Sequence, residues 1–127
     1  MRLLHKLHQF LTLAANEAVI TGIRRALGYQ QLSAATLAAA TNITLPTITT
    51  PGVPGGSVVQ VVPGLAVIQC NGGVARWRDD GVAPTSTVGM TIPDGGELDY
   101  TGDIAKIQFI VSSSAPILDI ALYSGMA

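Results

Sequence analysis

The stretch that decides the fold runs from residue 74 to residue 110 and reads VARWRDDGVAPTSTVGMTIPDGGELDYTGDIAKIQFI. Its first residues alternate in character, which places Ala75 and Trp77 on one face of a strand and puts three neighbours on the other: Val74, Arg76 and Arg78. The triplet Asp79-Asp80-Gly81 predicts a turn, because Asp side chains bond nearby backbone groups and Gly readily adopts a positive φ. The stretch therefore opens with a half-buried strand that ends at residue 78.

The second half of the stretch repeats this pattern of turn and strand. Pro93-Asp94-Gly95-Gly96 has the residue types of a tight turn, since Pro presets the first dihedral and Gly permits the next. Residues 104–111 form the most apolar alternation of the chain, with Ile107, Phe109 and Val111 on one side and Ile104 just before them. The sequence predicts a second strand here.

Five short motifs follow one another between Val74 and Tyr123. They are R-W-R-D-D-G, then P-T-x-T-x-G-M from Pro84, a Gly-rich turn, T-G-D after Tyr100, and the pair I-Q-F-I and L-D-I-A-L-Y. In this order they resemble a recurrent small β-sandwich of tailed bacteriophages, found in virion structural proteins of the head decoration, head fibre and neck or tail accessory type. The resemblance implies a virion component for about half of the chain and does not extend to its N-terminal third.

Further strands are predicted on both sides of this stretch. Residues 57–62 and 65–70 read as a hairpin around Pro63-Gly64, and Asn71-Gly72-Gly73 reads as a turn into the strand of Trp77. Pro116 is expected to interrupt the chain before a last strand, in which Leu118, Ile120 and Leu122 point inward and Asp119 and Tyr123 point outward. Seven or eight short strands predict a mainly β fold, an antiparallel β-sandwich or jelly roll with an N-terminal α-helical arm.

The N-terminal region predicts an amphipathic helix over residues 1–28. Gly28 suits a helix C-cap, and Arg24 and Arg25 suit the last turn, where cations are favoured. The apolar stripe has the spacing of a short coiled coil and forms the predicted assembly interface: Leu4, Leu7, Phe10, Leu11, Ala14 and Ala18. We expect this stripe to pack on copies of itself or on a neighbouring protein. The alternatives are packing on its own sandwich, a membrane-surface helix, or a signal peptide, whose apolar core Asn16 and Glu17 would interrupt.

Charge divides the chain into a basic arm and an acidic body. Residues 1–25 carry a formal charge of +3 and residues 26–127 a formal charge of −4, which together give the net charge of −1. Residues 29–56 contain no charged residue and predict an Ala, Thr and Pro-rich linker or arm that joins the sandwich of residues 57–127. A basic arm on an acidic body indicates that the arm docks elsewhere.

Length and composition favour one domain that has partners. At 127 residues the chain is the size of a single domain. Charged residues make up 12% of the sequence, against about a quarter in typical globular proteins, so much of the surface must be neutral. Contacts with partners are the simplest way to keep such a surface soluble. Cys70 is the only cysteine and is expected to be a small buried apolar side chain.

The residues capable of chemistry do not form a recognisable catalytic or metal pattern. His5 and His8 are close enough on a helix to share a metal but supply only two ligands, so no metal or cofactor is expected. Most of the acids lie beside Gly in turns, where backbone chemistry alone favours Asp, so no catalytic residue and no enzyme activity are expected. A calcium site is an open alternative if four of these acids converge: Asp79, Asp80, Asp99 and Asp103.

One group of body residues has the chemistry of a ligand contact. Arg76 and Arg78 flank Trp77, and this arrangement suits stacking on a sugar or a base, while the alternative is a Trp that fills the core beside Arg residues paired with Asp79 and Asp80. The resemblance to tailed-phage proteins implies that the chain is a non-enzymatic structural component of a virion. It would be a capsid decoration or cement protein or a collar-type subunit, assembled in the host cytoplasm. Its expected partners are other virion proteins (major capsid, portal or collar) and further copies of itself, with a trimer preferred by analogy. Neither nucleic acid nor a membrane is expected as a partner. The alternative function is a carbohydrate-binding module on a phage tail or fibre.

Overall fold

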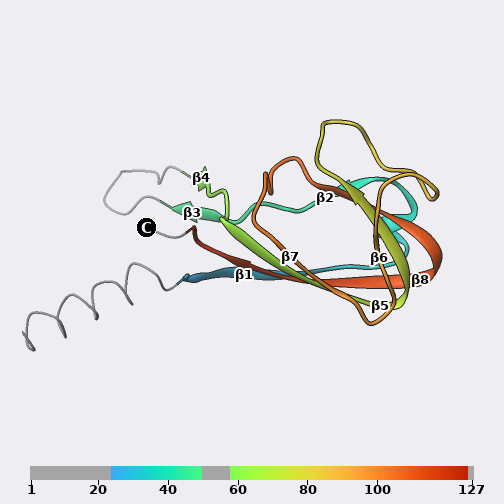
Figure 1. The fold of residues 1–127 in the computed structure, drawn as a ribbon. Coiled ribbons are helices and arrows are strands. Elements are labelled where there is room, and N and C mark those ends of the chain that lie inside the picture. The colour runs from blue at the N-terminus through green and yellow to red at the C-terminus, as the bar shows by residue number, and fades with distance from the viewer. Residues whose placement is uncertain (1–23, 50–57, 126–127) are drawn as a thin grey trace, which may run out of the picture.

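The structure is a computed structural model that describes residues 24–49 and 58–125. The described chain is mainly β and its paired strands are antiparallel (Figure 1). The strands are β1 (Ala26–Leu32), β2 (Thr41–Asn42), β3 (Thr47–Thr49), β4 (Val58–Gln60), β5 (Leu65–Arg78), β6 (Met90–Ile92), β7 (Glu97–Tyr100) and β8 (Gln108–Tyr123), with one 3₁₀ turn, η1 (Thr36–Ala38). Six of these described strands form one sheet, and β3 and β4 form a separate two-stranded sheet.

The centre of the main sheet is one long antiparallel pair. β5 has 14 residues and β8 has 16, and they pair from Leu65 opposite Tyr123 to Arg78 opposite Gln108. β1 and β2 lie along the outer side of β8, whereas β6 and β7 lie along the outer side of β5. β1 and β7 thus flank one half of the central pair, and β2 and β6 flank the other half.

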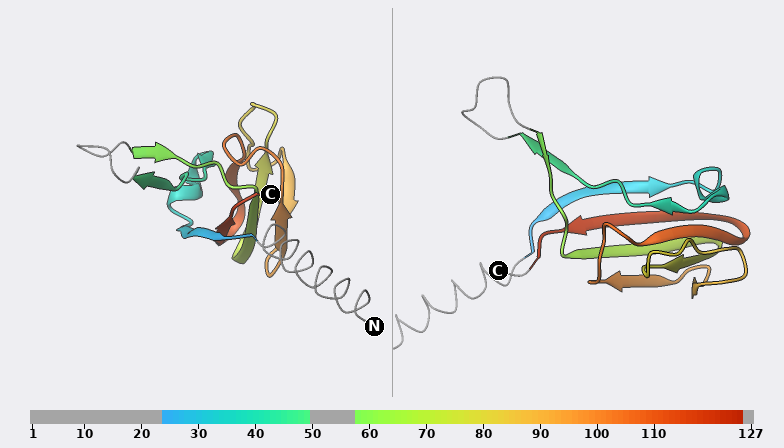
Figure 2. Two further views of the ribbon diagram at one scale, coloured as in Figure 1. Left: turned by 90° about the vertical axis from the view of Figure 1, so that its left-hand side faces the viewer. Right: turned by 90° about the horizontal axis from the view of Figure 1, so that it is seen from above.

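Bulges bend the central pair near its middle. Gly72 of β5 lies opposite two residues of β8, Ala115 and Pro116, because Asn71 pairs with Ile117 and Gly73 with Ser114. Gly72 has a φ of +91°, and a second irregularity follows between Val74 and Ala75. Bulges of this kind bend a strand and increase its twist. Both strands curve, so that the two halves of the sheet lie in two layers (Figures 1 and 2).

Two of the predicted strand breaks are therefore wrong. Asn71-Gly72-Gly73 continues β5 opposite a bulge of β8 and is not a turn, and Pro116 lies within β8 and does not interrupt it. The same residue types serve both purposes, since Gly supplies the positive φ of a bulge and Pro is tolerated in a strand where ladder bonding is already broken. The predicted strand over residues 104–111 also begins late, because β8 starts at Gln108 and residues 104–106 form a turn.

The core lies between the two layers and takes its side chains from both. The predicted inward residues Leu118, Ile120 and Leu122 are buried, as are Ile107 and Phe109, so these alternations are confirmed. Ala66, Ile68, Cys70 and Ala75 of β5 face the same interior, together with residues of the outer strands and connections: Leu32, Leu37, Ile43, Ile92, Tyr100 and Ile104. The predicted burial of Cys70 is confirmed. One continuous apolar core supports the whole folded sheet.

β3 and β4 form a short ribbon that stands away from this body (Figures 1 and 2). Ile48 pairs with Val59, and Val61 N–H donates a 2.8 Å hydrogen bond to the Pro46 carbonyl at the base of the ribbon. The predicted hairpin around Pro63-Gly64 is therefore wrong, because β4 pairs with β3 and not with β5. Gly64 N–H instead donates to the Tyr123 carbonyl, which carries the chain from the ribbon into the main sheet.

The start of the described chain is a strand. Residues 1–23, with the predicted helix stripe and the two histidines, lie outside the described residues, but Ala26 already belongs to β1, so the predicted helix does not reach Gly28. The predicted linker of residues 29–56 likewise contributes β1, η1, β2 and β3, and β1 and β2 belong to the main sheet. Helix propensity around Leu32 to Ala40 yields to strand pairing and one 3₁₀ turn, because β8 offers an open edge. Over residues 24–49 and 58–125 there is no helix with the length and apolarity needed to cross a membrane.

Candidate functional site

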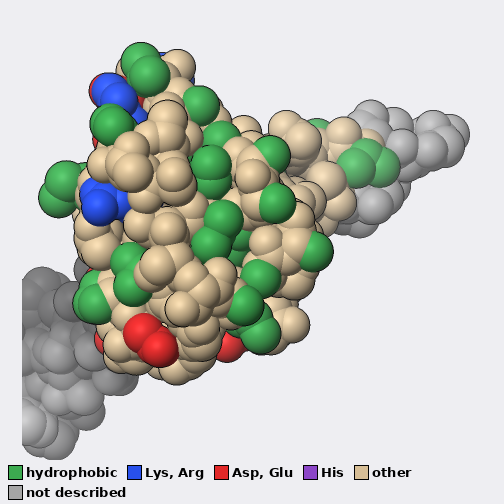
Figure 3. Space-filling view, turned by 90° about the vertical axis from the view of Figure 1, so that its right-hand side faces the viewer, with side chains coloured by type: hydrophobic (Ala, Val, Ile, Leu, Met, Phe, Trp, Pro, Cys, Tyr) green, Lys and Arg blue, Asp and Glu red, His purple; other side chains and the backbone are tan. Residues whose placement is uncertain are grey.

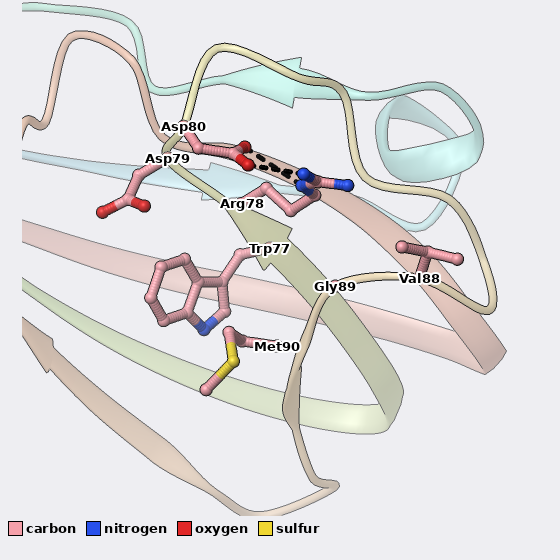
Figure 4. Close-up of a pocket in the computed structure, with 7 residues that line it drawn as sticks. All are labelled: Trp77, Arg78, Asp79, Asp80, Val88, Gly89 and Met90. Carbon is pink, nitrogen blue, oxygen red and sulfur yellow. Dashed lines mark hydrogen bonds and ion pairs between the residues drawn. The ribbon is translucent and has the colours of Figure 1, made fainter.

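A pocket of about 360 Å³ lies at the end of β5, beside the loop of residues 79–89 (Figure 4). Its floor and walls come from the last residues of β5, the following turn and the start of β6. The lining residues are Trp77, Arg78, Asp79, Asp80, Val88, Gly89 and Met90. The loop contributes one side of the pocket and the strand ends the other.

Trp77 is held between the core and the pocket. It is partly buried and packs against the core cluster, and its ring meets the Tyr100 ring edge-on with centroids 5.5 Å apart. Met90, its partner across the β5–β6 pair, lies beside it and is 61% exposed. The predicted core role of Trp77 is thus fulfilled in part, and the rest of the indole lines the pocket with the Met90 thioether.

Asp79 is fixed by Tyr100. The Tyr100 hydroxyl donates a 2.5 Å hydrogen bond to Asp79 Oδ2, which joins the end of β7 to the turn after β5. Burial raises the pKa of Tyr100 well above its usual value, and the hydrogen bond to the Asp79 carboxylate raises it further. At neutral pH Tyr100 is therefore a hydrogen-bond donor that orients this carboxylate.

Arg78 and Asp80 form a bidentate ion pair on the pocket wall. The hydrogen bond from Arg78 lowers the pKa of Asp80, and the same bond raises the pKa of Arg78. Asp80 also accepts a hydrogen bond from Val82 N–H, which stabilises the turn around Gly81 with its φ of +84°. The predicted turn at Asp79-Asp80-Gly81 and the predicted pairing of an Arg with Asp80 are both confirmed.

Arg76 does not line the pocket but fastens the loop that does. Its Nη1 donates to the Gly89 carbonyl at 2.9 Å, and its Nε donates to the Ser86 carbonyl at 3.2 Å. Ser112 of β8 also donates to the Ser86 carbonyl, at 2.7 Å. Of the three predicted ligand contacts, the structure thus brings Trp77 and Arg78 to one pocket and gives Arg76 a supporting place.

The four acids proposed for calcium do not converge. Asp79 and Asp80 have the separate partners described above, and Asp99 lies in β7 opposite Val67. Asp103 accepts a hydrogen bond from Ala105 N–H, and its carboxylate lies 3.9 Å from the Lys106 amine. Among the residues described, no three metal-ligating side chains come together. The predicted assembly residues Leu4, Leu7, Phe10, Leu11, Ala14 and Ala18 lie outside the described part of the chain.

The pocket offers an aromatic and apolar floor with carboxylates at its margin. An indole and a thioether favour a ligand with a flat apolar face, and the carboxylates favour hydroxyl donors around it. The local sequence does not show that Met90 and Tyr100 lie beside Trp77, because their positions depend on which strands pair with β5. The sequence signals nearest to them are the x-G-M end of the P-T-x-T-x-G-M motif and the Tyr before T-G-D.

A second, smaller pocket of about 230 Å³ lies on the outer face of the other half-sheet. Tyr29, Val67, Asp119 and Tyr123 are among its lining residues. Asp119 accepts hydrogen bonds from the Tyr29 hydroxyl and from Gln31 Nε2, and these bonds lower its pKa. The outward position predicted for Asp119 and Tyr123 is consistent with this placement.

Comparison of the chain with protein-family models, with characterised proteins and with solved structures found no match.

Proposed function

We propose that this chain is a non-enzymatic structural component of a tailed-phage virion, a capsid decoration or cement protein or a collar-type subunit anchored through its N-terminal segment. The observation that carries the proposal is the β3–β4 ribbon, which stands away from the body and exposes apolar side chains such as Ile48 and Val58. Apolar surface of this kind marks a place of contact between proteins. The motifs between Val74 and Tyr123 supply the virion context by resemblance.

A neutral surface supports the same proposal. No charged residue occurs between Arg25 and Arg76, a stretch that includes β1 to β4 and most of β5. The face of the body shown in Figure 3 likewise presents mainly neutral and apolar side chains, with charged groups in small clusters. A protein that is packed between other subunits needs few surface charges to stay soluble, because its neighbours cover its apolar surface.

The body is suited to a mechanical role. In this proposal the folded-over sheet acts as a small β-sandwich, its long β5–β8 pair resisting deformation while the ribbon and the N-terminal segment hold neighbouring subunits. Burial of apolar surface across subunit boundaries would strengthen the particle against internal DNA pressure or fasten a fibre to it.

Immunogold labelling of intact particles tests the proposed place. Antibody raised against residues 58–125 should label particles of the phage that encodes the chain, over the whole head for a decoration protein or at one vertex for a collar subunit. The absence of label and of the protein itself from purified particles would overturn the virion role.

The predicted helix stripe gives a second test, of attachment. Replacing Leu7 and Leu11 by Asp should remove the protein from particles while its β-type circular dichroism stays unchanged, because the strands of the described chain are formed by residues from Ala26 onward. The matched control places the same two carboxylates off the stripe, at Gln9 and Thr12, and should leave attachment intact. Loss of β-structure in the Leu7 and Leu11 variant would contradict this division between arm and body.

The pocket beside Trp77 favours a second candidate function, a carbohydrate-binding module on a phage tail or fibre. Aromatic rings commonly stack on sugar faces, and Asp79 and Asp80 place carboxylates at the rim. Tryptophan fluorescence discriminates the two functions, since Trp77 is the only Trp of the chain. A shift in emission on addition of host surface polysaccharide, lost in Met90→Lys, favours this candidate, and an unchanged spectrum favours the structural one.

A further inference from the structure

The outer face of one half-sheet carries two rows of side chains that cross four strands. This half consists of β1, β7, residues 65–71 of β5 and residues 117–123 of β8. The first row is polar, and strand pairing places its members side by side: Gln31, Asp119, Gln69 and Glu97. The second row lies two positions along each strand, on the same face: Tyr29, Ala121, Val67 and Asp99.

Tyr29 lies along this face and does not stand out from it. It pairs with Ala121, but its hydroxyl donates a hydrogen bond to Asp119, which comes two residues earlier in β8. The ring therefore runs diagonally from the second row to the first. Tyr29 is 65% exposed, so the ring is held in place at its hydroxyl end and remains open to a ligand. An aromatic ring in this position offers its face for stacking.

The smaller pocket of about 230 Å³ lies beside this ring, and we call it the Tyr29 hollow. Ala121 and Val67 are its smallest lining side chains, and Tyr123, two residues after Ala121 in β8, lines it as well. Pockets for drug-sized molecules have volumes of about 300–1,000 Å³. The Tyr29 hollow is therefore suited to one ring of a longer ligand, whose next units would lie over the polar row.

The charge of the face disfavours an anionic ligand. Asp119, Glu97 and Asp99 lie on it, and the four strand segments that form it contain no Lys or Arg. A phosphate or an acidic sugar would meet three carboxylates without a cation from these strands, which is electrostatically unfavourable.

The neutral polar groups of the face favour hydroxyls over an ammonium group. Asp119 Oδ1 accepts hydrogen bonds from Tyr29 and Gln31, whereas Asp119 Oδ2 has no partner within the described chain. The Gln31 and Gln69 side chains are amides, which both donate and accept hydrogen bonds. An ammonium group only donates and could not use the amide N–H groups, whereas a hydroxyl can bond to both kinds of group. Hydroxyls around a ring with a flat face are the chemistry of a neutral sugar.

We propose that this face binds a neutral polysaccharide, with one sugar ring stacked on Tyr29 in the Tyr29 hollow and its hydroxyls bonded to Asp119 Oδ2 and the Gln69 amide. The site is separate from the pocket beside Trp77, because the two pockets share no lining residue. The inference does not depend on the virion role, since it concerns a surface of the body and not the attachment of the chain.

Retention on polysaccharide beads tests the site. The full chain should bind beads that carry at least one of three neutral polymers, a glucan, a mannan or a galactan, and should not bind alginate or poly-lysine beads. Tyr29→Ala removes the stacking ring and should weaken binding about tenfold. Ala121→Leu fills the Tyr29 hollow and should also weaken binding. The β-type circular dichroism of both variants should stay unchanged, because neither side chain belongs to the buried core.

Met90→Lys is the control, because it obstructs the pocket beside Trp77 and leaves the Tyr29 hollow intact. This variant should bind as the wild type does. Binding to none of the three neutral polymers, or to alginate or poly-lysine alone, would overturn the inference. Binding that Met90→Lys abolishes and Tyr29→Ala keeps would also overturn it, by placing the sugar beside Trp77. A chain that is found on particles but binds no neutral polymer would overturn this inference alone, and a sugar-binding chain that is absent from particles would overturn the virion role alone.

Discussion

The Tyr100 hydroxyl lies 2.5 Å from Asp79 Oδ2 and donates a hydrogen bond to it. Tyr100 ends β7, which pairs with the first half of β5, whereas Asp79 follows the last residue of β5. The contact therefore joins opposite ends of one long strand, brought together because the strand is bent. The Tyr100 ring packs against Trp77 in the same place, so the bond couples the fold of the sheet to the shape of the pocket.

Removing this hydroxyl should weaken the fold moderately. Tyr100→Phe keeps the ring that packs on Trp77 and lets the exposed Asp79 carboxylate return to water, so the free energy of unfolding should fall by about 1 kcal/mol. Urea denaturation at pH 7, followed by Trp77 fluorescence, measures it. Tyr123→Phe is the control, because the described structure gives the Tyr123 hydroxyl no side-chain hydrogen bond. An equal loss in the control would contradict a specific role for the Asp79 contact.

Alkaline pH should lower the free energy of unfolding through the same residue, Tyr100. Burial and the bond to Asp79 raise the pKa of Tyr100 in the folded protein above the value of about 10 in the unfolded chain. Its contribution is fully present below pH ~10 and is lost as the pH rises through the folded value, because only the unfolded chain then releases the proton easily. The unfolding free energy of the wild type should fall more steeply above pH ~10 than that of Tyr100→Phe. Parallel curves would refute this linkage, since Tyr29, whose pKa is also raised, is present in both proteins.

Local patterns predicted the faces of the strands but not their lengths or neighbours. Alternation placed Ala75, Phe109 and Ile120 inward, and turn chemistry placed the ends at Gly81 and Gly95, because these features depend on residues close in sequence. The glycines opposite the β8 bulge were predicted as a turn, because a positive φ such as that of Gly72 occurs in both features. Only the pairing of Asn71 and Gly73 with residues more than forty positions later distinguishes a bend inside a strand from its end.

In the candidate site, too, contacts between residues close in sequence were predictable and contacts made by strand pairing were not. Arg78 and Asp80 are two residues apart, and their pairing was predictable from that spacing. Trp77 was predicted as a possible ligand contact and lines the pocket, but Tyr100 and Met90 reach it only through the pairing of β7 and β6 with β5. Which strands pair depends on the whole sheet and cannot be inferred from residues that are close in sequence. The neighbours of β3 and β4 were missed for this reason as well.

The bulge gives a sharp prediction about glycine. A Cβ on Gly73 would lie 2.5 Å from the Ser113 carbonyl oxygen and 2.9 Å from Ala115 N, both backbone atoms of the facing strand. Gly73→Ala should therefore force β5 and β8 apart and lower the free energy of unfolding by about 1–3 kcal/mol. Gly28→Ala is the matched control, since nothing lies within 4 Å of its Cβ position, and it should change stability by less than about 0.5 kcal/mol. Thermal unfolding compares them, and equal melting temperatures would show that the bulge accepts a side chain.

Acid should destabilise the outer face through Asp119. Hydrogen bonds from Tyr29 and Gln31 lower the pKa of Asp119 in the folded protein below the unfolded value of about 3.9. Its contribution is present above that pH and is lost as the pH falls through the folded value. In Asp119→Asn the amide oxygen still accepts a hydrogen bond but cannot titrate, so stability should fall less steeply between about pH 5 and pH 2. Urea titrations across this range measure the slopes, and Asp80, whose pKa is also lowered, contributes equally to both.

Arg76 should control the mobility of the loop that walls the pocket. Its guanidinium holds the Ser86 and Gly89 carbonyls, and Val88 between them donates a 3.0 Å hydrogen bond from its N–H to Thr85 Oγ1. Arg76→Ala removes the charged donor but no core side chain, so loop opening should become easier by about 1.4 kcal/mol, which is tenfold in the exchange rate of the Val88 amide.

Hydrogen exchange followed by mass spectrometry resolves this effect. Peptides covering residues 84–90 should exchange faster in Arg76→Ala, while peptides from the centre of β8 should keep the wild-type rate. Lys106→Ala is the control, because Lys106 lies beside Asp103 and away from this loop. Faster exchange across β8 as well would mean that Arg76 supports the whole sheet through its 3.2 Å bond to Ser112 Oγ, and that the loop does not move as a separate unit.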